Sequence, residues 1–159
     1  MIIDKIVSLF KTKSMKKLFL NLKAFILSLK SKTPEKISKI MLREALQISS
    51  AESCTGGLVS SRLTDISGSS AYVRMNFVTY SNEAKHKILN VSEETLKKYG
   101  AVSEECAREM AQGLLQLTKS DVVICTTGVA GPTGSEAKPV GLMYAACGFN
   151  DKIVVRKFE

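Results

Sequence analysis

Apolar and polar residues alternate along most of this chain with the periods of helices and strands. The segment Thr33-Pro34-Glu35 indicates a helix start, with Thr33 as N-cap and Pro34 as the first helical residue, and apolar residues then recur at helical spacing. The buried stripe of this helix is expected to consist of Ile37, Ile40, Met41 and Leu42. The pattern therefore predicts a folded domain over 34–159.

Short runs of β-branched and apolar residues further along the chain predict strands. They fall near residue 48 and over 73–79, 121–128, 142–149 and 153–158. The turn at Asn150-Asp151 joins the last two runs and indicates an antiparallel hairpin. The run over 121–128 is rich in valine, which is typical of a buried central strand.

Serine caps and helical spacing predict further helices between these strands. They are expected over 58–66, from Ser81 to about residue 89, and after Ser92 and Ser103, with Gly100 ending the helix that Ser92 caps. The core side of the last of these helices is expected to be Met110, Leu114, Leu115 and Leu117. Helices that alternate with strands, together with a hairpin, predict an α/β domain with a mixed sheet.

Residues 1–33 form a separate, lysine-rich extension. Lysines alternate there with isoleucine, leucine and phenylalanine at spacings that predict a basic amphipathic helix. Lys23 and Lys30 interrupt the apolar run, which disfavours both a membrane-spanning helix and a secretory signal. Two interpretations stay open: an extension that is solvated or packed on a partner, and a helix that lies peripherally on an anionic membrane surface.

Charge is distributed very unevenly between this extension and the body. The chain of 159 residues has a formal charge of +8, and residues 1–34 contain eight lysines against Asp4, so the body is nearly neutral. A nucleic-acid-binding fold needs Lys and Arg gathered on its folded face, so we expect no nucleic acid partner. The length allows one domain, and a hydrophobic content of 45% excludes intrinsic disorder.

Cysteine and histidine usage predicts a protein of a reducing compartment. The four cysteines form no C-x-x-C pair, and three of them lie in apolar or helical surroundings, so a cytoplasmic location is expected. His86 is the only histidine, and the thiols are not clustered. We therefore expect no structural zinc site. We also expect no cofactor.

The segment AESCTGG offers candidate nucleophiles where a strand gives way to a helix. Ser53 and Cys54 lie at this junction, and Gly56 and Gly57 let a substrate approach the backbone. Amides at the start of a helix can hold an anion or a developing oxyanion. Because the same residue types form ordinary capped turns, the residues alone leave open whether this is a site.

A serine nucleophile needs a base, and two candidates are adjacent in the sequence. His86 lies on a polar helix face without an obvious carboxylate to orient it, which disfavours a Ser-His-Asp triad. Lys85 can serve only if its surroundings lower its pKa from about 10.4 to about 7.5, at a cost of roughly 4 kcal/mol. The residues alone do not distinguish such a lysine from a solvated one.

A glycine-rich loop over 128–134 follows the expected buried strand. Ligands of open α/β sheets bind at such carboxyl ends. No G-K-[ST] follows, and Pro132 removes one amide, so the loop is not a phosphate-binding loop of an ATPase. A structural turn is the alternative.

Taken in order, AESCTGG, SGSSAY, FVTYSNEAKHKIL, YGAVSEE and TGVAGPTGSEAKPVG resemble the CinA C-terminal family. Its members are nicotinamide-nucleotide amidases, also called nicotinamide mononucleotide deamidases. The resemblance covers residues 35–159. It implies a three-layer α/β/α domain that hydrolyses the carboxamide of nicotinamide mononucleotide to nicotinate mononucleotide and ammonia, in pyridine nucleotide recycling, without a metal.

The resemblance also assigns residues. Ser53 matches the proposed nucleophile, Lys85 the activating base and Tyr80 an active-site hydroxyl. We expect the backbone amides of Thr55, Gly56 and Gly57 to form the oxyanion hole. Residues that match the glycine loop lining the nucleotide pocket are Thr127, Gly128 and Gly131.

Two departures from the family pattern keep alternatives open. The family continues with a Gly-x-Arg turn and a last helix where this sequence ends at RKFE, and the lysine-rich extension has no counterpart in the family core. One alternative is therefore a catalytically silent nucleotide-binding remnant, and another is a membrane-surface-associated protein tethered by its extension. A homodimer is a further interpretation, because a domain without its last helix exposes apolar surface.

Overall fold

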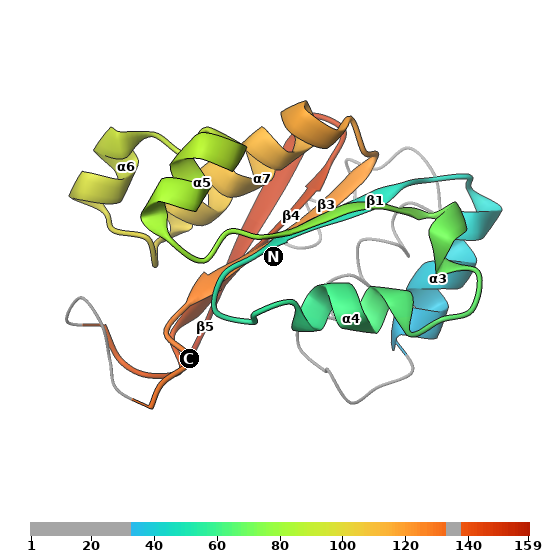
Figure 1. Ribbon diagram of the computed structural model, residues 1–159, viewed down its shortest axis with the longest axis horizontal. Helices are drawn as coiled ribbons and strands as arrows, with labels where there is room; N and C mark the ends of the chain where they lie inside the picture. The colour runs from blue at the N-terminus through green and yellow to red at the C-terminus, as the bar shows by residue number, and fades with distance from the viewer. Residues whose placement is uncertain (1–32, 133–137) are drawn as a thin grey trace, which may run out of the picture.

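Five strands form one mixed sheet in this computed structural model, which describes residues 33–132 and 138–159 (Figure 1). The order across the sheet is β2-β1-β3-β4-β5. The bounds are β1 Ile48–Glu52, β2 Val73–Val78, β3 Val122–Gly128, β4 Met143–Phe149 and β5 Lys152–Phe158. All five strands therefore lie where the sequence predicts them.

The directions of the strands bring the carboxyl ends of three strands together at one edge of the sheet. β1 runs parallel to β2 and to β3, and Glu52 pairs with Val78 on one side and with Thr126 on the other. β4 is antiparallel to β3, and β5 forms the expected hairpin with β4. The carboxyl ends of β1, β2 and β3 thus meet where ligands of α/β sheets bind.

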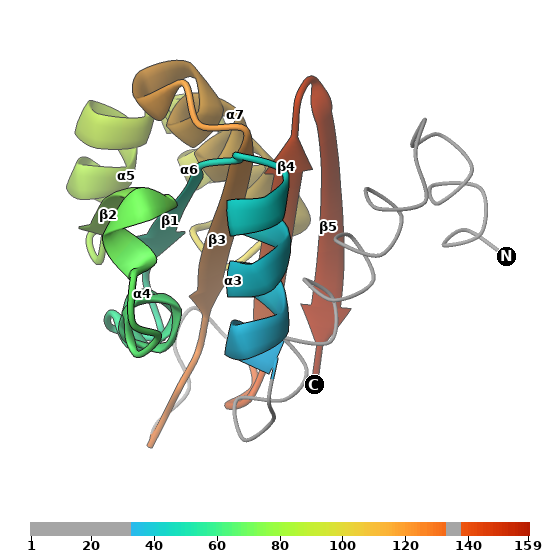
Figure 2. The same cartoon turned by 90° about the vertical axis from the view of Figure 1, so that its right-hand side faces the viewer.

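Helices cover both faces of the sheet, which makes the fold the expected three-layer α/β/α domain (Figures 1 and 2). α3 (Thr33–Arg43) and α4 (Leu58–Thr64) lie on one face. α5 (Asn82–Leu89), α6 (Glu93–Lys98) and α7 (Glu104–Thr118) lie on the other. A short 3-10 helix, η1 (Ser69–Ala71), precedes β2.

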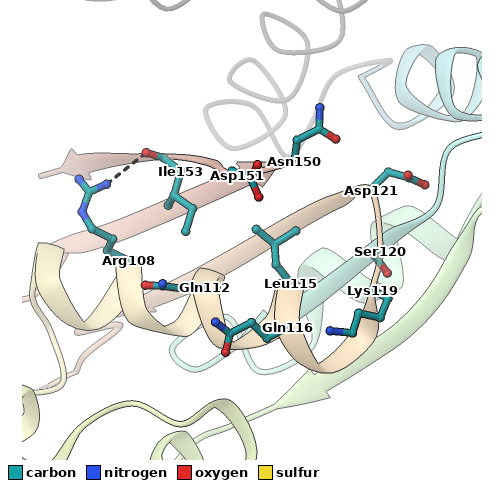
Figure 3. Close-up of a pocket in the computed structure, with 10 residues that line it drawn as sticks. All are labelled: Arg108, Gln112, Leu115, Gln116, Lys119, Ser120, Asp121, Asn150, Asp151 and Ile153. Carbon is teal, nitrogen blue, oxygen red and sulfur yellow. Dashed lines mark hydrogen bonds between the residues drawn. The ribbon is translucent and has the colours of Figure 1, made fainter.

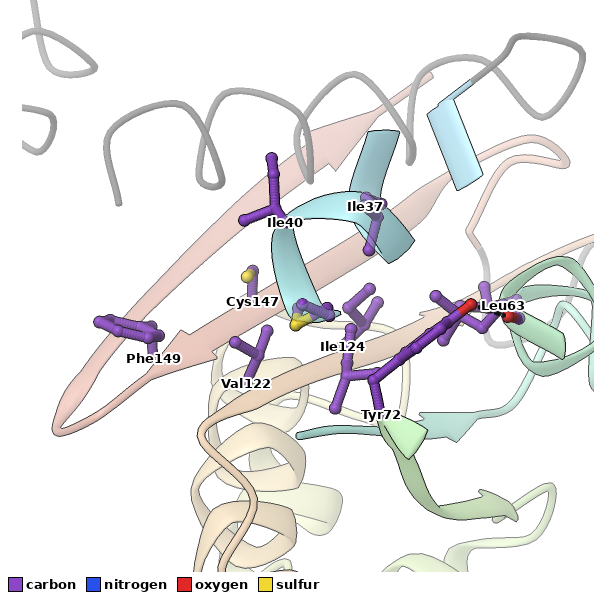
Figure 4. Packing of buried hydrophobic residues seen from close by; sticks show 11 residues of the cluster. Ile37, Ile40, Leu63, Tyr72, Val122, Ile124, Cys147 and Phe149 are labelled. Atoms are coloured by element: carbon purple, nitrogen blue, oxygen red, sulfur yellow. Dashed lines mark hydrogen bonds between the residues drawn. The ribbon is translucent and has the colours of Figure 1, made fainter. Parts of the chain in front are cut away.

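The core under α3 and α4 is a continuous apolar cluster (Figure 4). It consists of Ile37, Ile40, Met41, Ile48, Val59, Leu63, Tyr72, Val122, Ile124, Cys147 and Phe149. The hydroxyl of Tyr72 donates to the carbonyl of Leu63 at 2.7 Å, so its polar end is satisfied within the cluster. The prediction for Leu42 is wrong, because this side chain is 49% exposed.

A second core lies between α7 and the opposite face of the sheet. Its buried members are Ala51, Leu89, Val91, Cys106, Ala107, Met110, Ala111, Leu114, Val123, Cys125 and Ala146. Cys106, Cys125 and Cys147 are buried free thiols, as expected for three of the four cysteines. Met110 and Leu114 are buried and Leu115 packs against this core, but the prediction for Leu117 is wrong because its side chain is 48% exposed.

Serine caps fix the starts of the helices on this face. The hydroxyls of Ser81, Ser92 and Ser103 accept hydrogen bonds from the third amide after each cap, which confirms the predicted starts of α5, α6 and α7. The start of α5 decides where Lys85 lies. α3 begins at Thr33, one residue before the predicted start.

Two expected features fall outside the described residues. They are the amphipathic helix up to residue 32 and the end of the glycine loop, residues 133–134. Among the helices of the described ranges, each is too short or too polar to cross a lipid bilayer.

Gly113 sets the distance between α5 and α7. A Cβ atom at this position would lie 1.7 Å from the Leu89 carbonyl oxygen and 2.6 Å from its carbonyl carbon. The end of α5 therefore rests directly on the backbone of α7, and a side chain at residue 113 cannot be accommodated without moving α5.

Gly113→Ala is expected to lower the free energy of unfolding by about 1–3 kcal/mol, since overpacking forces backbone shifts. Urea unfolding measures this, with Gln112→Ala, an exposed neighbour on the same helix, as the matched control that should stay within about 0.5 kcal/mol of wild type. An alanine at residue 113 with unchanged stability would show that α5 is not held by this contact.

Candidate active site

Ser53 lies immediately after β1, in the turn that leads into α4. Its amide donates to the Thr126 carbonyl at 3.0 Å, which continues the β1–β3 pairing by one residue. Gly56 and Gly57 then adopt left-handed backbone conformations with φ of 59° and 103°, which few other residues adopt. The chain can therefore reverse within a few residues, and Ser53 is left 7% exposed at the edge of the sheet.

Lys85 reaches this serine from α5. The side chain is 1% exposed, and its Nζ lies 3.0 Å from Ser53 Oγ. The same Nζ donates to the carbonyl oxygens of Thr79 and Tyr80 at 3.0 and 3.1 Å. These two residues follow β2, so the base is oriented by the segment that leads into its own helix.

Three oxygen atoms lie within hydrogen-bond distance of Lys85 Nζ: the carbonyl oxygens of Thr79 and Tyr80, and Ser53 Oγ. The two carbonyls can only accept hydrogen bonds, so they hold N–H groups of the lysine, whereas the Ser53 hydroxyl can also donate. Once the amine has lost a proton, its lone pair can accept the hydroxyl proton of Ser53. The arrangement can therefore deprotonate the serine.

Tyr80 contributes mainly through its backbone. Its carbonyl holds Lys85, whereas the residue as a whole is 74% exposed and borders the pocket described next. The hydroxyl role that the resemblance implies therefore stays a prediction.

A pocket of about 330 Å³ opens beside the serine and the lysine. Its lining residues are Ser53, Cys54, Tyr80, Asn82, Lys85, Ala101, Val102, Thr127, Gly128, Val129, Ala130 and Gly131. The predicted binding residues Thr127, Gly128 and Gly131 are thus at the pocket. Thr127 also holds the opposite wall, because its hydroxyl donates to the Ala101 carbonyl at 2.7 Å.

Gly128 allows the pocket wall to approach the nucleophile turn. A Cβ atom there would lie 2.7 Å from the Leu142 carbonyl oxygen and 3.0 Å from Cys54 Sγ. Cys54 thus packs against the glycine loop. Burial raises the pKa of the Cys54 thiol, although the charge of Lys85 opposes this, so the thiol stays protonated at neutral pH and is a poor nucleophile.

The oxyanion-hole prediction is wrong for Gly56 and Gly57. The amide of Gly56 donates to the Ser53 carbonyl at 3.1 Å, and that of Gly57 donates to Glu52 Oε2 at 3.1 Å. Neither amide is available to a substrate, and neither residue lines the described part of the pocket. Thr55 does not line it either, but the described residues offer no acceptor to its amide.

Glu52 is the residue of this site that the sequence reasoning missed. It is the last residue of β1, it is fully buried, and its carboxylate faces the start of α4. Oε2 accepts hydrogen bonds from Thr55 Oγ1 at 2.6 Å, Gly57 N at 3.1 Å and Val59 N at 3.0 Å. Oε1 accepts from Ser60 N at 2.8 Å and from Ser60 Oγ at 2.6 Å. A carboxylate before a Gly-Gly helix start was the signal in the sequence.

Burial alone would raise the pKa of Glu52, but the hydrogen bonds from Ser60, Thr55 and Val59 outweigh it and hold the pKa below its ordinary value of 4.5. Stability from this group is thus fully present above pH 4.5 and is lost as the pH falls through the lower folded-state pKa. As the pH falls below 4.5, the melting temperature of the wild type should therefore fall more steeply than that of Glu52→Gln. Parallel curves would contradict this assignment.

His86 lies apart from the pocket. Its Nδ1 is 2.8 Å from the Val91 carbonyl oxygen, and its Nε2 is 3.8 Å from the Glu93 carboxylate on the protein surface. A triad through His86 is therefore not formed, as expected. The described residues contain no cluster of three or more His, Cys, Asp or Glu side chains that could hold a metal ion.

A larger cavity of about 720 Å³ lies at the other end of the sheet, between α7 and the β4–β5 hairpin (Figure 3). It is lined by Arg108, Gln112, Leu115, Gln116, Lys119, Ser120, Asp121, Asn150, Asp151 and Ile153. Arg108 donates to the Ile153 carbonyl across it at 3.1 Å. This cavity contains no nucleophile paired with a base, so the smaller pocket is the candidate active site.

Several curated proteins are similar in sequence to this chain. A CinA-like protein of Chloroherpeton thalassium is 54% identical over 125 residues, which are 78% of this chain and 30% of that protein. A putative competence-damage inducible protein of Caldicellulosiruptor saccharolyticus is 51% identical over 126 residues, 79% of this chain and 30% of that protein. The chain thus spans about a third of the length of these relatives.

Solved structures share the fold. The competence/damage inducible protein CihA of Agrobacterium tumefaciens superposes with a TM-score of 0.76 at 42% identity, covering 79% of this chain and 77% of that one. The competence damage-inducible protein A of Klebsiella pneumoniae gives a TM-score of 0.76 at 33% identity, covering 78% of each chain. The profile of the CinA C-terminal domain matches residues 30–159. The chain therefore belongs to the CinA C-terminal domain family.

Proposed function

We propose that this chain is an amidohydrolase that converts nicotinamide mononucleotide to nicotinate mononucleotide and ammonia. One observation carries the proposal: Lys85 Nζ lies 3.0 Å from Ser53 Oγ, with both side chains buried beside a pocket. A buried amine against a serine hydroxyl is an arrangement for nucleophilic catalysis. The choice of the pyridine mononucleotide as substrate rests on the family resemblance.

The first half of the reaction forms an acyl-enzyme. Ser53 Oγ attacks the carboxamide carbon while its proton moves to Lys85 Nζ, and the carbonyl oxygen becomes an oxyanion. Lys85 then gives this proton to the amide nitrogen, the C–N bond breaks, and ammonia leaves. The amide of Thr55, which has no acceptor among the described residues, is the candidate donor to the oxyanion.

The second half regenerates the serine. A water molecule gives a proton to Lys85 Nζ and attacks the ester carbon, and the bond to Ser53 Oγ breaks as Lys85 returns the proton to that oxygen. The product is the carboxylate. Since Thr79 and Tyr80 fix two N–H groups of Lys85, the same lone pair can serve both halves without rotation of the amine.

The pocket suits the amide end of a small ligand. Its volume of about 330 Å³ lies at the lower end of the range for small-molecule sites, which is about 300–1,000 Å³. Its walls combine backbone of the glycine loop with the apolar Ala101 and Val102, which fits a flat aromatic ring. Among the described lining residues, Lys85 carries the amino group, and two carbonyls and a hydroxyl contact its nitrogen.

The test is product analysis. Purified chain is incubated with nicotinamide mononucleotide, and ammonia and nicotinate mononucleotide are measured in parallel, with nicotinamide as a second substrate. We expect equal amounts of both products and slower turnover of free nicotinamide. A folded chain that binds the mononucleotide in calorimetry without releasing ammonia would replace this proposal with the nucleotide-binding alternative.

A further inference from the structure

The Glu52 carboxylate is surrounded by groups that donate hydrogen bonds. The amides of Gly57, Val59 and Ser60 can only donate. The hydroxyls of Thr55 and Ser60 donate to it as well. Each carboxylate oxygen faces at least one amide that can only donate, so a glutamine amide in this place would put an N–H group against an N–H group whichever way it turned. The same hydrogen bonds favour the ionised carboxylate and hold its pKa below the ordinary value.

The hydrogen bonds continue from Glu52 into the neighbouring strand. Thr55 Oγ1 donates its one proton to Glu52. In the 2.7 Å contact between the hydroxyls of Thr55 and Thr126, Thr126 Oγ1 is therefore the donor. Thr126 also accepts the Ser53 amide on its backbone carbonyl at 3.0 Å. The nucleophile turn is thus attached to β3 twice, once through its backbone and once through Glu52 and Thr55.

A third attachment joins the turn to the base. The Glu52 carbonyl accepts the Thr79 amide at 2.7 Å, and the Thr79 carbonyl accepts from Lys85 Nζ at 3.0 Å. Glu52 therefore contacts the nucleophile turn through its side chain and the segment that holds the base through its backbone. A change in the Glu52 side chain alters the first set of contacts and leaves the second in place.

We propose that Glu52 is a positioning residue of the amidase reaction, whose carboxylate holds the Ser53 turn so that Ser53 Oγ faces Lys85 Nζ. The inference rests on the proposed function. It goes beyond that function because Glu52 touches neither the pocket nor the reacting atoms. Its effect is carried to Ser53 by Thr55 and Gly57, which lie two and four residues after the nucleophile.

A second carboxylate in the same protein provides the matched control. Glu109 on α7 accepts hydrogen bonds from Ser92 N at 2.7 Å and from Thr95 Oγ1 at 2.5 Å, so it stabilises the start of α6 much as Glu52 stabilises the start of α4. Neither Glu109 nor these partners line the described part of the pocket. If Glu52 only stabilises a helix start, Glu52→Gln and Glu109→Gln should have the same consequences.

The experiment compares Glu52→Gln, Glu109→Gln and the milder Thr126→Val, each at a temperature where circular dichroism shows it folded. Steady-state kinetics separates kcat from KM, and a fluorophosphonate probe, which Ser53 attacks with loss of fluoride, reports serine reactivity without the substrate. We expect kcat and the labelling rate of Glu52→Gln to fall by about 10²-fold, the cost of a small misplacement, with KM little changed. Thr126→Val should lose less, and Glu109→Gln should match wild type.

Equal kcat and equal labelling in folded Glu52→Gln and wild type would overturn the inference and leave the proposed function intact. If Glu52→Gln does not fold, Thr126→Val decides: an unchanged labelling rate overturns the inference and a reduced one supports it. A wild type that is labelled at Ser53 but releases no ammonia refutes the proposed function alone, and the labelling rates still test Glu52. A wild type with neither turnover nor labelling refutes both.

Discussion

Ammonia release is expected to fall by about 10³-fold or more in Ser53→Ala, because the hydroxyl that forms the acyl-enzyme is removed and Lys85 has nothing to deprotonate. Ser53 is a small side chain beside an existing pocket, so its loss should leave the melting temperature nearly unchanged. A discontinuous ammonia assay with both proteins at equal concentration measures the ratio.

Cys54→Ala is the informative companion of Ser53→Ala. The Cys54 thiol also lines the pocket, but burial raises its pKa, so we expect activity within a few-fold of wild type. The reverse outcome, with activity retained in Ser53→Ala and lost in Cys54→Ala, would assign the nucleophile to the cysteine. Mass spectrometry of a trapped acyl-enzyme distinguishes the two residues directly.

Lys85→Met is expected to lower kcat by about 10²–10⁴-fold, the contribution typical of a general base. Methionine has nearly the same length and fills the buried site, but the carbonyls of Thr79 and Tyr80 lose their donor. Leaving such groups unsatisfied should cost about 1–3 kcal/mol of stability. Activity should be measured well below the melting temperature so that the two effects are separated.

The pH dependence provides a second signature of Lys85. Wild-type activity should rise with pH as the amine loses its proton, and this rise should disappear in Lys85→Met. Lys87→Met is the matched control, since Lys87 lies on the same helix but is exposed and pairs with Glu83 at 2.6 Å. A loss of activity in Lys87→Met equal to that of Lys85→Met would show that α5 as a whole, and not its buried amine, is required.

The strands and helix starts could be predicted from the sequence because they depend on local patterns. Alternation and serine caps identify the elements, but they do not show how far a neighbouring element extends. Leu42 follows Met41 and is rotated from it by about 100°, which turns it away from the sheet. Leu117 lies on the same side of α7 as Met110, but α5 ends opposite Gly113 and does not reach the last turn.

The residues of the candidate active site could be predicted from the sequence only in part. Ser53 and Lys85 are 32 residues apart, and no spacing rule reveals that β1 and β2 bring them within 3.0 Å; their pairing came from the family resemblance. Glu52 escaped notice because an acidic residue at a strand end is usually solvated. The amides of Gly56 and Gly57 were expected to bind the oxyanion, but they already donate within the protein. Gly57 donates to the buried Glu52 carboxylate, which the sequence reasoning had overlooked, and Gly56 donates to the Ser53 carbonyl within the turn.

The carbonyls of Thr79 and Tyr80, which hold Lys85 Nζ, show how the site is divided along the chain. The two carbonyls that hold the amine belong to residues 79–80, and the groups that donate to the Glu52 carboxylate belong to residues 55–60. Apart from the attachment of the nucleophile turn to Thr126, the two halves of the catalyst are thus short, contiguous segments that follow the neighbouring parallel strands β1 and β2. The exposed part of the connection between them, over 65–70, supplies none of these groups, so loop grafting or circular permutation there should preserve the chemistry as long as the buried Tyr72 is kept.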